Sequence, residues 1–411
     1  MDTILFILTI TFLASCLFRV FRKTTPDLHL IFAIVLVVKV IAAIGLGLIY
    51  SSYYEGGDTW NFYKAGLRFN DRNETLAEYF GELSEPINYS TTHDPGNAFF
   101  ARLTSIVVKL SLGNYWITAA FFATVSFITL WTLMMRLIKS GIDKWPILIA
   151  FFGFPSVVLW SSGLLKDTLM LICLASVAIA IIPLFSSKQK FNTIELAAGL
   201  LGLFIILKVK YYLFAVCAGL LICICTFEIF KSWLQRLSVL IRSFLGFGFV
   251  ALLIIALSQM HYNLKLERVL SVIVENYEAY NHLDQGKKVD FDTLEPTIAS
   301  FIWHSPKALF TGIFRPLIWE GWNVVSIWVS IENTILLAFF IYSLRGWRSY
   351  SINSATIGAL AYSMILATLF ALSTPNLGTL SRYKVSFLPI FIFVIMYAIY
   401  NSRKTGRNIH G

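Results

Sequence analysis

The chain has 411 residues, of which 57% are hydrophobic, 16% aromatic and only 14% charged. A soluble domain of this size could not bury so much apolar surface, and runs of about twenty apolar residues recur along the whole sequence, which predicts a polytopic helical membrane protein. The formal net charge of +10 would suggest nucleic-acid binding in a soluble protein, but here the basic residues cluster in short loops between apolar segments and indicate membrane orientation instead. No nucleic-acid partner is expected.

The first apolar segment is MDTILFILTITFLASCLFRVFRK, in which an acid precedes the apolar residues and a basic cluster follows them. A cleaved signal peptide carries basic residues ahead of its apolar region, so this order predicts a first membrane span with its N-terminus outside. Further apolar segments follow, and we predict one transmembrane domain over residues 1–411 with about eleven spans. The predicted spans are 3–20, 29–50, 115–135, 145–163, 167–186, 194–208, 211–230, 238–259, 323–344, 354–373 and 385–400.

Two long loops separate these spans, at residues 51–114 and 260–322. The first loop contains a short apolar stretch, Ala98 to Leu112, that carries Arg102 and Lys109 and is predicted to be an interfacial or re-entrant helix rather than a span. The sequence therefore predicts an all-α, polytopic integral membrane protein with two long outer loops.

Basic residues recur at every second break between the predicted spans. If the spans alternate in direction, all of these residues fall on one side, which the positive-inside rule identifies as the cytoplasm. We therefore expect a cytoplasmic (inner) membrane location, with the N-terminus and both long loops outside and the C-terminus inside. The residues are Arg19, Arg22, Lys23, Arg136, Lys139, Lys144, Lys188, Lys190, Lys231, Arg236, Arg345, Arg348, Arg403, Lys404 and Arg407.

Polar clusters gather on the predicted outer face, whereas the cytoplasmic loops carry little beyond their basic residues. Ionisable groups at membrane depth are costly, so such clusters indicate function by default. The six clusters are GGDTW (Gly56 to Trp60), THDPGN (Thr92 to Asn97), WSSGLLKD (Trp160 to Asp167), LKVKYY (Leu207 to Tyr212), FRPLIWEGWN (Phe314 to Asn323) and STPNLGTLSRYK (Ser373 to Lys384).

Asp58 is the most distinctive of the acidic residues in these clusters. Two glycines before it can simply end one helix, with Asp58 capping the next. The combination of an acid with the aromatic residues Trp60 and Tyr63 favours a chemical role instead, in which Asp58 is catalytic and Tyr63 contacts the substrate.

The DPGN sequence has both a structural and a functional interpretation. Pro95 suits the first turn of a helix, with His93 or Asp94 as its cap. Alternatively, His93 and Asp94 join Asp58 as ligands of a divalent metal. A divalent metal is the one cofactor that the sequence suggests.

Cations at the predicted outer ends of the spans are candidates for anion binding. Lys166 and Asp167 open a span after a helix break, where Asp167 suits the helix dipole and Lys166 is predicted to meet an anion. Lys210 and Arg315 are further cations at this depth, and contact with lipid headgroups is their alternative role.

The segment SRYKVSFLPIF places three polar side chains at the start of the last span. Arg382, beside Tyr383, is predicted to bind an anion. Lys384 is predicted to extend toward lipid headgroups, as long basic side chains near helix ends commonly do.

These candidates together indicate sugar transfer from a lipid carrier. A lipid phosphate or diphosphate is the anion that lies naturally at this depth, and the cations would stabilise it as a leaving group. Asp58 would take the proton from the attacking hydroxyl, while the sugar passes through an oxocarbenium-like state. A single displacement of this kind inverts the anomeric centre. The expected partners are a polyprenyl-phosphate-linked sugar, the lipid bilayer and a glycan or lipid acceptor.

The span layout and several short motifs resemble the GT-C class of membrane glycosyltransferases, which use polyprenyl- or dolichyl-phosphate-linked sugars on the periplasmic or lumenal face. GDTWNFY resembles the acidic motif of their first outer loop, and the resemblance implies that Asp58 is the catalytic base or helps to hold a metal. Three later segments of the class are similar to HDPGNAFFARLTSIV, SGLLKDTLML and SRYKVSFLPI. The chain departs from the class in showing no second acidic pair at the first motif.

Two alternatives stay open. Wzy-type polysaccharide polymerases have a similar early acidic motif, a DPG-like turn before an apolar helix, and outer-face arginines, for which Arg315 and Arg382 are the candidates. A transporter of lipid-linked glycans predicts internal repeats and ionisable groups near the bilayer midplane. The sequence shows no convincing repeat, and we place its charges near the outer ends of the spans.

Overall fold

The computed structural model describes residues 2–52, 57–72, 75–84, 94–259, 262–281, 287–321, 323–345 and 353–407. Every regular element in these ranges is a helix, apart from one isolated bridge between Lys288 and Asn376, and this confirms the all-α prediction. Several residues of the clusters and motifs given above lie outside the described part of the chain: Gly56, Thr92, His93, Trp322 and Arg348. The side chains of Arg403, Lys404 and Arg407 lie outside it as well.

Eight of the described helices are long and apolar enough to cross a membrane, which identifies the chain as a multi-spanning membrane protein. They match eight of the eleven predicted spans. The eight candidates are Asp2–Lys23, Pro26–Ser52, Tyr115–Lys139, Lys166–Phe185, Tyr211–Leu234, Leu240–Ser258, Ser326–Leu344 and Ser354–Ser373.

The other three predicted spans are helical but differ from a simple membrane-crossing helix. The segment 145–163 is divided among three short helices, and 194–208 lies in a helix of 17 residues. The last predicted span belongs to a pair of helices, Leu377–Ser386 and Leu388–Ser402, that is bent by 67°. The described residues thus support about eight spans, or nine if the bent pair is one span, and eleven stays a prediction.

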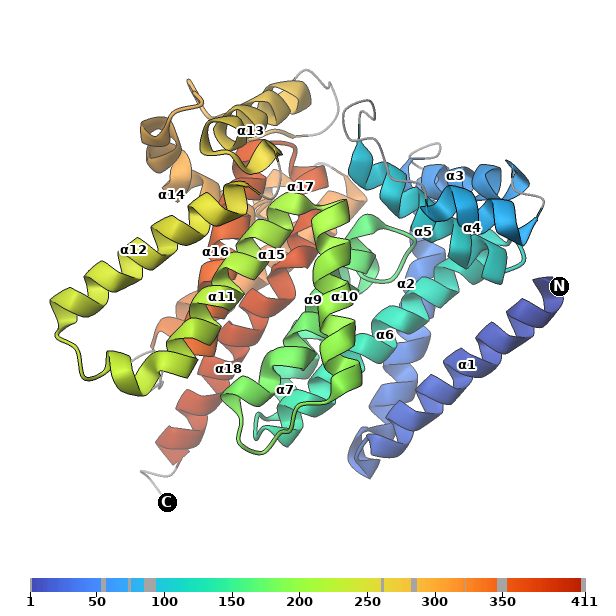
Figure 1. Cartoon of the computed structure of the whole chain (residues 1–411), viewed down its shortest axis with the longest axis horizontal. Helices are drawn as coiled ribbons and strands as arrows, with labels where there is room; N and C mark the ends of the chain where they lie inside the picture. Colours follow the sequence, from blue (N-terminus) through green and yellow to red (C-terminus); the bar gives the residue numbers. More distant parts are fainter. Residues whose placement is uncertain are drawn as a thin grey trace. The chain divides into compact units, whose positions relative to one another are not determined.

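The chain divides into two compact units, Met1–Lys144 with Val157–Lys210, and Trp145–Ser156 with Tyr211–Gly411. In unit 1, α6 packs against α1, α2, α5 and α9, and α10 lies beside α9 (Figure 1). The helices of unit 1 are α1 (Asp2–Lys23), η1 (Pro26–Leu28), α2 (His29–Ser52), α3 (Asp58–Arg72), α4 (Leu76–Ser84), α5 (Pro95–Leu110), α6 (Tyr115–Lys139), α9 (Lys166–Phe185) and α10 (Thr193–Val209).

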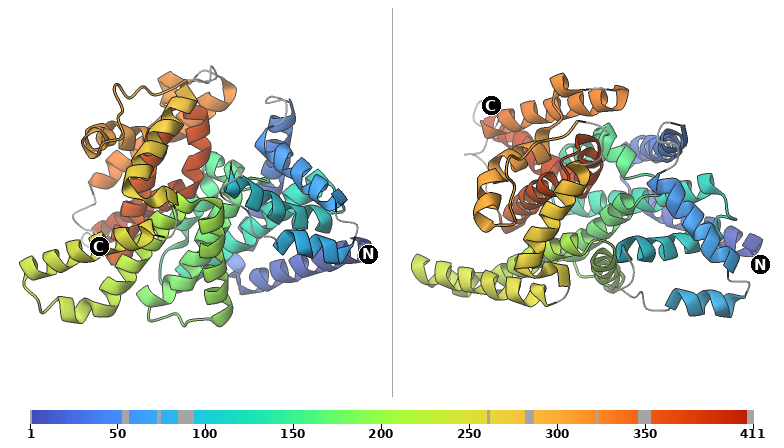
Figure 2. Two further views of the ribbon diagram at one scale, coloured as in Figure 1. Left: turned by 45° about the horizontal axis from the view of Figure 1, so that its top comes forward. Right: turned by 90° about the horizontal axis from the view of Figure 1, so that it is seen from above.

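Unit 2 is arranged around α16, which packs against α11, α13, α14 and α18. Helices α11 and α12 form an antiparallel pair, visible in Figures 1 and 2. The helices of unit 2 are η2 (Ile149–Gly153, a π-helix), α11 (Tyr211–Leu234), α12 (Val239–Ser258), η3 (Tyr262–Leu264), α13 (Leu266–Asn281), α14 (Ile298–Phe314), η4 (Ile318–Glu320), α15 (Val324–Leu344), α16 (Ser354–Ser373), α17 (Leu377–Tyr383), η6 (Lys384–Ser386) and α18 (Leu388–Arg407). The chain passes between the units within two short helices, α7 (Lys144–Leu148) and α8 (Pro155–Trp160), and again between Lys210 and Tyr211.

The helix termini of unit 1 meet at two ends. At the first, which we call the Asp58 end, the last turns of α2 and α10 and the first turns of α6 and α9 meet α3 and α5 (Figure 1). At the second, which we call the Arg136 end, Trp131 Nε1 donates to Thr24 Oγ1, and Lys144 pairs with Asp27.

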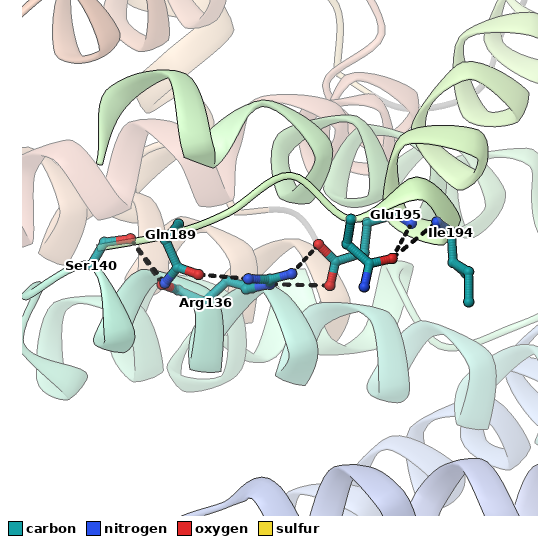
Figure 3. Close-up of polar contacts among 6 residues, drawn as sticks. Arg136, Ser140, Gln189, Ile194 and Glu195 are labelled. Carbon is teal, nitrogen blue, oxygen red and sulfur yellow. Dashed lines mark hydrogen bonds and ion pairs between the residues drawn. The ribbon is translucent and has the colours of Figure 1, made fainter. Parts of the chain in front are cut away.

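A polar network closes the Arg136 end (Figure 3). The Arg136 guanidinium pairs with Glu195 and donates to Gln189 Oε1, while Gln189 Nε2 returns a bond of 3.1 Å to the carbonyl of Arg136. Asn192 caps α10 through the amides of Ile194 and Glu195, which fixes the carboxylate at the positive end of the helix dipole. Arg136 therefore ties α6 to α10 in addition to being one of the basic residues that predicted orientation.

Close packing in unit 2 generates a stability prediction at Gly312. A Cβ at this position would lie 2.1 Å from the carbonyl oxygen of Ala367, where α14 crosses α16. Gly312→Ala should lower the free energy of unfolding by about 1–3 kcal/mol, because neither backbone can move aside cheaply. The measurement is thermal unfolding of the purified protein in detergent.

Gly246 in α12 supplies the matched control, because a Cβ there meets nothing within 4 Å. Gly246→Ala should be neutral or stabilising by up to about 1 kcal/mol, as expected for alanine in an exposed helix. Equal melting temperatures for the two variants would contradict the packing argument.

Candidate functional site

Asp58 is the first residue of α3 rather than the residue that caps it. The preceding Gly57 has φ of +93°, a conformation that favours glycine, and its carbonyl accepts the bond of the first turn from the Asn61 amide. A Cβ on Gly57 would also come within 2.9 Å of the Tyr50 ring. The backbone conformation and the close contact with Tyr50 therefore both require glycine at position 57. The helix begins directly after it, so the Asp58 carboxylate lies at the positive end of the α3 dipole.

The aromatic residues near Asp58 hold α3 against α2 and α6. Trp60 stacks on Tyr115 with ring centroids 3.8 Å apart, and its Nε1 donates to the carbonyl of Gly47 in α2. Tyr63 lies edge-on to Tyr115 and donates its hydroxyl to the carbonyl of Gly113. Burial raises the pKa of Tyr63, so this hydroxyl keeps its proton and remains a donor.

Each residue of DPGN has a defined place. Asp94 is the N-cap of α5 and accepts from the Asn97 amide at 2.9 Å, and Pro95 begins the helix, which confirms that interpretation. A Cβ on Gly96 would lie 2.4 Å from the carbonyl oxygen of Val209, so glycine permits the close approach of α5 to the end of α10. The Asn97 side chain donates to the second oxygen of Asp94.

Lys166 connects this turn to the start of α9. Its ammonium donates to Asn97 Oδ1, lies 3.9 Å from an Asp94 oxygen, and sits 5.8 Å from the centroid of the Phe62 ring. The side chain of Lys166 is 20% exposed and that of Asp94 is 53% exposed. Lys166 is therefore held by an amide, while the acid nearest to it remains open to solvent or substrate.

Lys210 and Asp167 form a second, more deeply buried pair. Lys210 follows the last turn of α10, and its ammonium donates to Asp167 Oδ1 at 2.6 Å, with side-chain exposures of 5% and 3%. A buried carboxylate and ammonium hold each other in the charged state only while both are present. This pair fixes α10 against α9 and offers little charge to a third group.

The structure thus brings five sequence-predicted residues together at one end of unit 1. Lys166 lies within electrostatic range of Asp94, Lys210, Asp167 and Asp58. We call this set the Asp58 cluster: Asp58, Asp94, Lys166, Asp167 and Lys210. It comes from four segments of the chain and contains three acids and two bases, so it can both accept a proton and place a cation beside an anionic group.

Arg315, in unit 2, is paired with an acid from its own segment. Its guanidinium pairs with Glu320, whose other oxygen accepts from the Leu317 amide at 2.9 Å. Burial raises the pKa of Glu320, but these hydrogen bonds outweigh the burial and hold the pKa below its ordinary value. Glu320 therefore stays ionised, and much of the Arg315 charge is already matched.

Arg382 and Tyr383 lie together in unit 2. The Arg382 guanidinium is 5.2 Å from the centroid of the Tyr383 ring, and the Tyr383 hydroxyl is 3.3 Å from that of Tyr280 in α13. The prediction that Lys384 extends toward lipid headgroups is wrong. Lys384 is 1% exposed and donates to the carbonyls of Ile313 and Arg315, because the bend after α17 turns it into the protein.

The candidate metal site is not assembled among the described residues, where no group of three or more His, Cys, Asp or Glu side chains is placed to hold an ion. His93, the sequence-predicted ligand beside Asp94, lies outside the described ranges.

Sequence reasoning missed two ionisable residues inside the spans. Lys39 lies in the middle of α2 and donates to the backbone and hydroxyl oxygens of Ser161, while Glu332 in α15 accepts from the Ser156 amide and from Trp328 Nε1. Both are visible in the sequence as single charges within apolar segments, which is a recognised functional signal. They correct the prediction that the charges lie near the outer ends of the spans.

Comparison with protein-family models, with curated proteins and with solved structures finds no match for this chain. The GT-C and Wzy resemblances of the short motifs therefore stay predictions.

The Asp167–Lys210 pair yields a prediction about protein stability that does not depend on any reaction. Asp167→Leu or Lys210→Met should each lower the free energy of unfolding by about 3–5 kcal/mol, because each leaves one buried charge without its partner. The double variant should be more stable than either single variant, since no buried charge remains. Thermal unfolding in detergent measures all three, and a double variant as unstable as the worse single one would contradict the argument.

Proposed function

We propose that the chain is a membrane glycosyltransferase that moves a sugar from a polyprenyl-phosphate carrier to a glycan or lipid acceptor during cell-envelope glycan synthesis. The observation that carries the proposal is the Asp58 cluster, in which acids and lysines from four segments meet at one end of a set of apolar helices. A lipid-linked phosphate reaches this depth with its chain in the bilayer, and a hydroxyl acceptor needs a base beside it.

The proposed reaction assigns a role to each part of the cluster. The acceptor hydroxyl oxygen attacks the anomeric carbon, the bond from that carbon to the phosphate oxygen breaks, and the phosphate leaves on its lipid. Asp58 takes the hydroxyl proton, as general base. Lys166 stabilises the negative charge that develops on the phosphate. The phosphate replaces Asp94, which lies 3.9 Å from the Lys166 ammonium, as the anionic partner of that lysine.

Three further residues that the sequence predicts to bind a lipid phosphate lie in unit 2: Arg315, Arg382 and Tyr383. Arg382, whose guanidinium lies 5.2 Å from the centroid of the Tyr383 ring, suits a planar, bidentate contact with phosphate oxygens. If these two arginines rather than Asp58 carried the reaction, a polymerase of lipid-diphosphate repeat units would be the better description.

A second candidate, a transporter of lipid-linked glycans, is favoured by a specific observation. Lys39 and Glu332 are buried ionisable groups within candidate spans, and both contact the interrupted helical segment that contains α8. Interrupted helices and midplane charges are features that transporters use. The experiments below distinguish this candidate from the transferase.

The primary test is mass spectrometry of lipid-linked glycans from a host that lacks the gene. The transferase predicts intermediates one sugar shorter than in the parent, and their mass identifies the sugar. Complete repeat units that fail to lengthen would indicate the polymerase. Unchanged lipid-linked glycans made at normal length would exclude both enzymes and favour the transporter.

Complementation of that host with variants tests the proposed base. Asp58→Asn should reduce product formation by about 100-fold to 10,000-fold, because an amide cannot accept the hydroxyl proton. Asp71→Asn is the matched control, since Asp71 is an exposed acid near the other end of the same helix and should retain activity. Full activity of Asp58→Asn, at equal protein levels in the membrane, would leave Asp58 with only a structural role.

A further inference from the structure

Lys39 places an ammonium group in the middle of an apolar helix. It lies within α2, its side chain is 0% exposed, and its Nζ donates to the Ser161 carbonyl at 3.0 Å and the Ser161 hydroxyl at 2.8 Å. Among the described residues it takes part in no ion pair. Since a cation at this depth is costly, the group it contacts must be one that needs a strong donor.

That group is the carboxyl end of α8, where the chain leaves the helix before α9 begins. A helix that stops inside a membrane protein leaves carbonyl groups that water cannot satisfy. Five consecutive carbonyls at this end, from Val157 to Ser161, each accept a hydrogen bond. The donors are the amides of Ser161 and Ser162, the hydroxyls of Ser162, Thr168 and Ser126, and the ammonium of Lys39.

The last of these carbonyls receives the strongest support. Ser126 Oγ donates to the Ser161 carbonyl at 2.7 Å, in addition to the bond from Lys39. A cation at the carboxyl end of a helix also interacts favourably with its dipole. The Ser161 carbonyl is thus held from α2 and from α6 at the same point.

The break that follows, residues 161–165, is packed against the same face of α2. A Cβ on Gly163 would lie 2.2 Å from Leu46 Cδ2, and Leu46 stands seven residues, or two helical turns, beyond Lys39. Leu164 is fully buried, and the Leu165 amide donates to the Gly163 carbonyl at 2.9 Å. The α2 helix therefore determines the path of the chain from Ser161 to the start of α9.

We propose that Lys39 is a positioning residue: by binding the carboxyl end of α8 it fixes the break 161–165 and thereby places Lys166 and Asp167 in the Asp58 cluster. The chemical purpose of this positioning rests on the proposed function, but the positioning itself does not. Lys39 donates to Ser161 and acts on Lys166 and Asp167 through the break that separates them from Ser161.

The test measures the accessibility of position 166 directly. In a background in which the five native cysteines are replaced by alanine, Lys166→Cys is labelled with a maleimide in detergent, with and without Lys39→Met. Lys39→Met keeps the length of the side chain but removes its donors. We expect the labelling rate to rise by about fivefold or more, because losing a charged donor shifts a local opening equilibrium by at least that factor.

Two controls separate positioning from general loosening of unit 1. Ser140→Cys, half-buried at the Arg136 end, should label at an unchanged rate in the Lys39→Met background. Lys39→Arg, which keeps a cation and its donors, should restore slow labelling at position 166. If Lys39→Met does not fold, Ser126→Ala removes the other donor to the same carbonyl and should accelerate labelling by a smaller factor.

The outcomes are distinct from those that test the enzyme. Equal rates at position 166 with and without Lys39→Met, within about twofold, would overturn the inference even if the glycan analysis supported the transferase. Equal acceleration at positions 140 and 166 would also overturn it, since Lys39 would then stabilise the whole unit. The labelling rate could rise at position 166 alone while the host that lacks the gene shows unchanged lipid-linked glycans. That combination would support the positioning role of Lys39 and reject the proposed reaction.

Discussion

A peptide group at the end of a helix needs a hydrogen-bond partner, and the hydrocarbon core of a membrane contains no bulk water to provide one. Among the described residues, ionisable side chains meet that need at three helix ends. Lys39 binds the carboxyl end of α8, Lys384 binds the carboxyl end of α14, and Glu332 accepts from an amide at the amino end of α8. In its ionised form, each group carries the charge that the local helix end favours. The interruptions of the helices therefore depend on buried ionisable residues rather than on glycine or proline alone.

The same pairing principle governs the Asp58 cluster. A buried ammonium beside a carboxylate, as in Lys210 with Asp167, is locked in place and barely available to a ligand. Lys166 is held instead by the neutral Asn97 amide, with Asp94 at a longer distance, so its charge is less fully matched. Within one small region the chain thus combines a fixed ion pair, which orders α9 and α10, with a cation that can exchange partners. For the proposed reaction, this division favours Lys166 over Lys210 as the group that contacts the phosphate.

Apolar length and the order of charges were enough to predict the all-α class, the eight long helices and the gathering of Asp58, Asp94, Lys166 and Lys210 at common helix ends. These features follow from local composition and from alternation of span direction. Partner choice could not be predicted in this way. Whether Lys384 faces lipid or backbone depends on a 67° bend between α17 and α18, and the Lys166 bond to Asn97 depends on how closely Gly96 lets α5 approach α10. Such distances are set by packing between segments far apart in the sequence.

The bond between Lys39 and Ser161 joins residues 122 positions apart. At a synthesis rate of about 5–20 residues per second, roughly 6–24 s separate the emergence of the lysine from that of its partner. During that interval α2 must enter the bilayer with a cation that has no carbonyl to bind, or wait beside the insertion machinery. Its span is the most apolar of the eight candidates, which offsets part of that cost. The order of biogenesis is therefore constrained: α2 can reach its final position only after α8 has been synthesised.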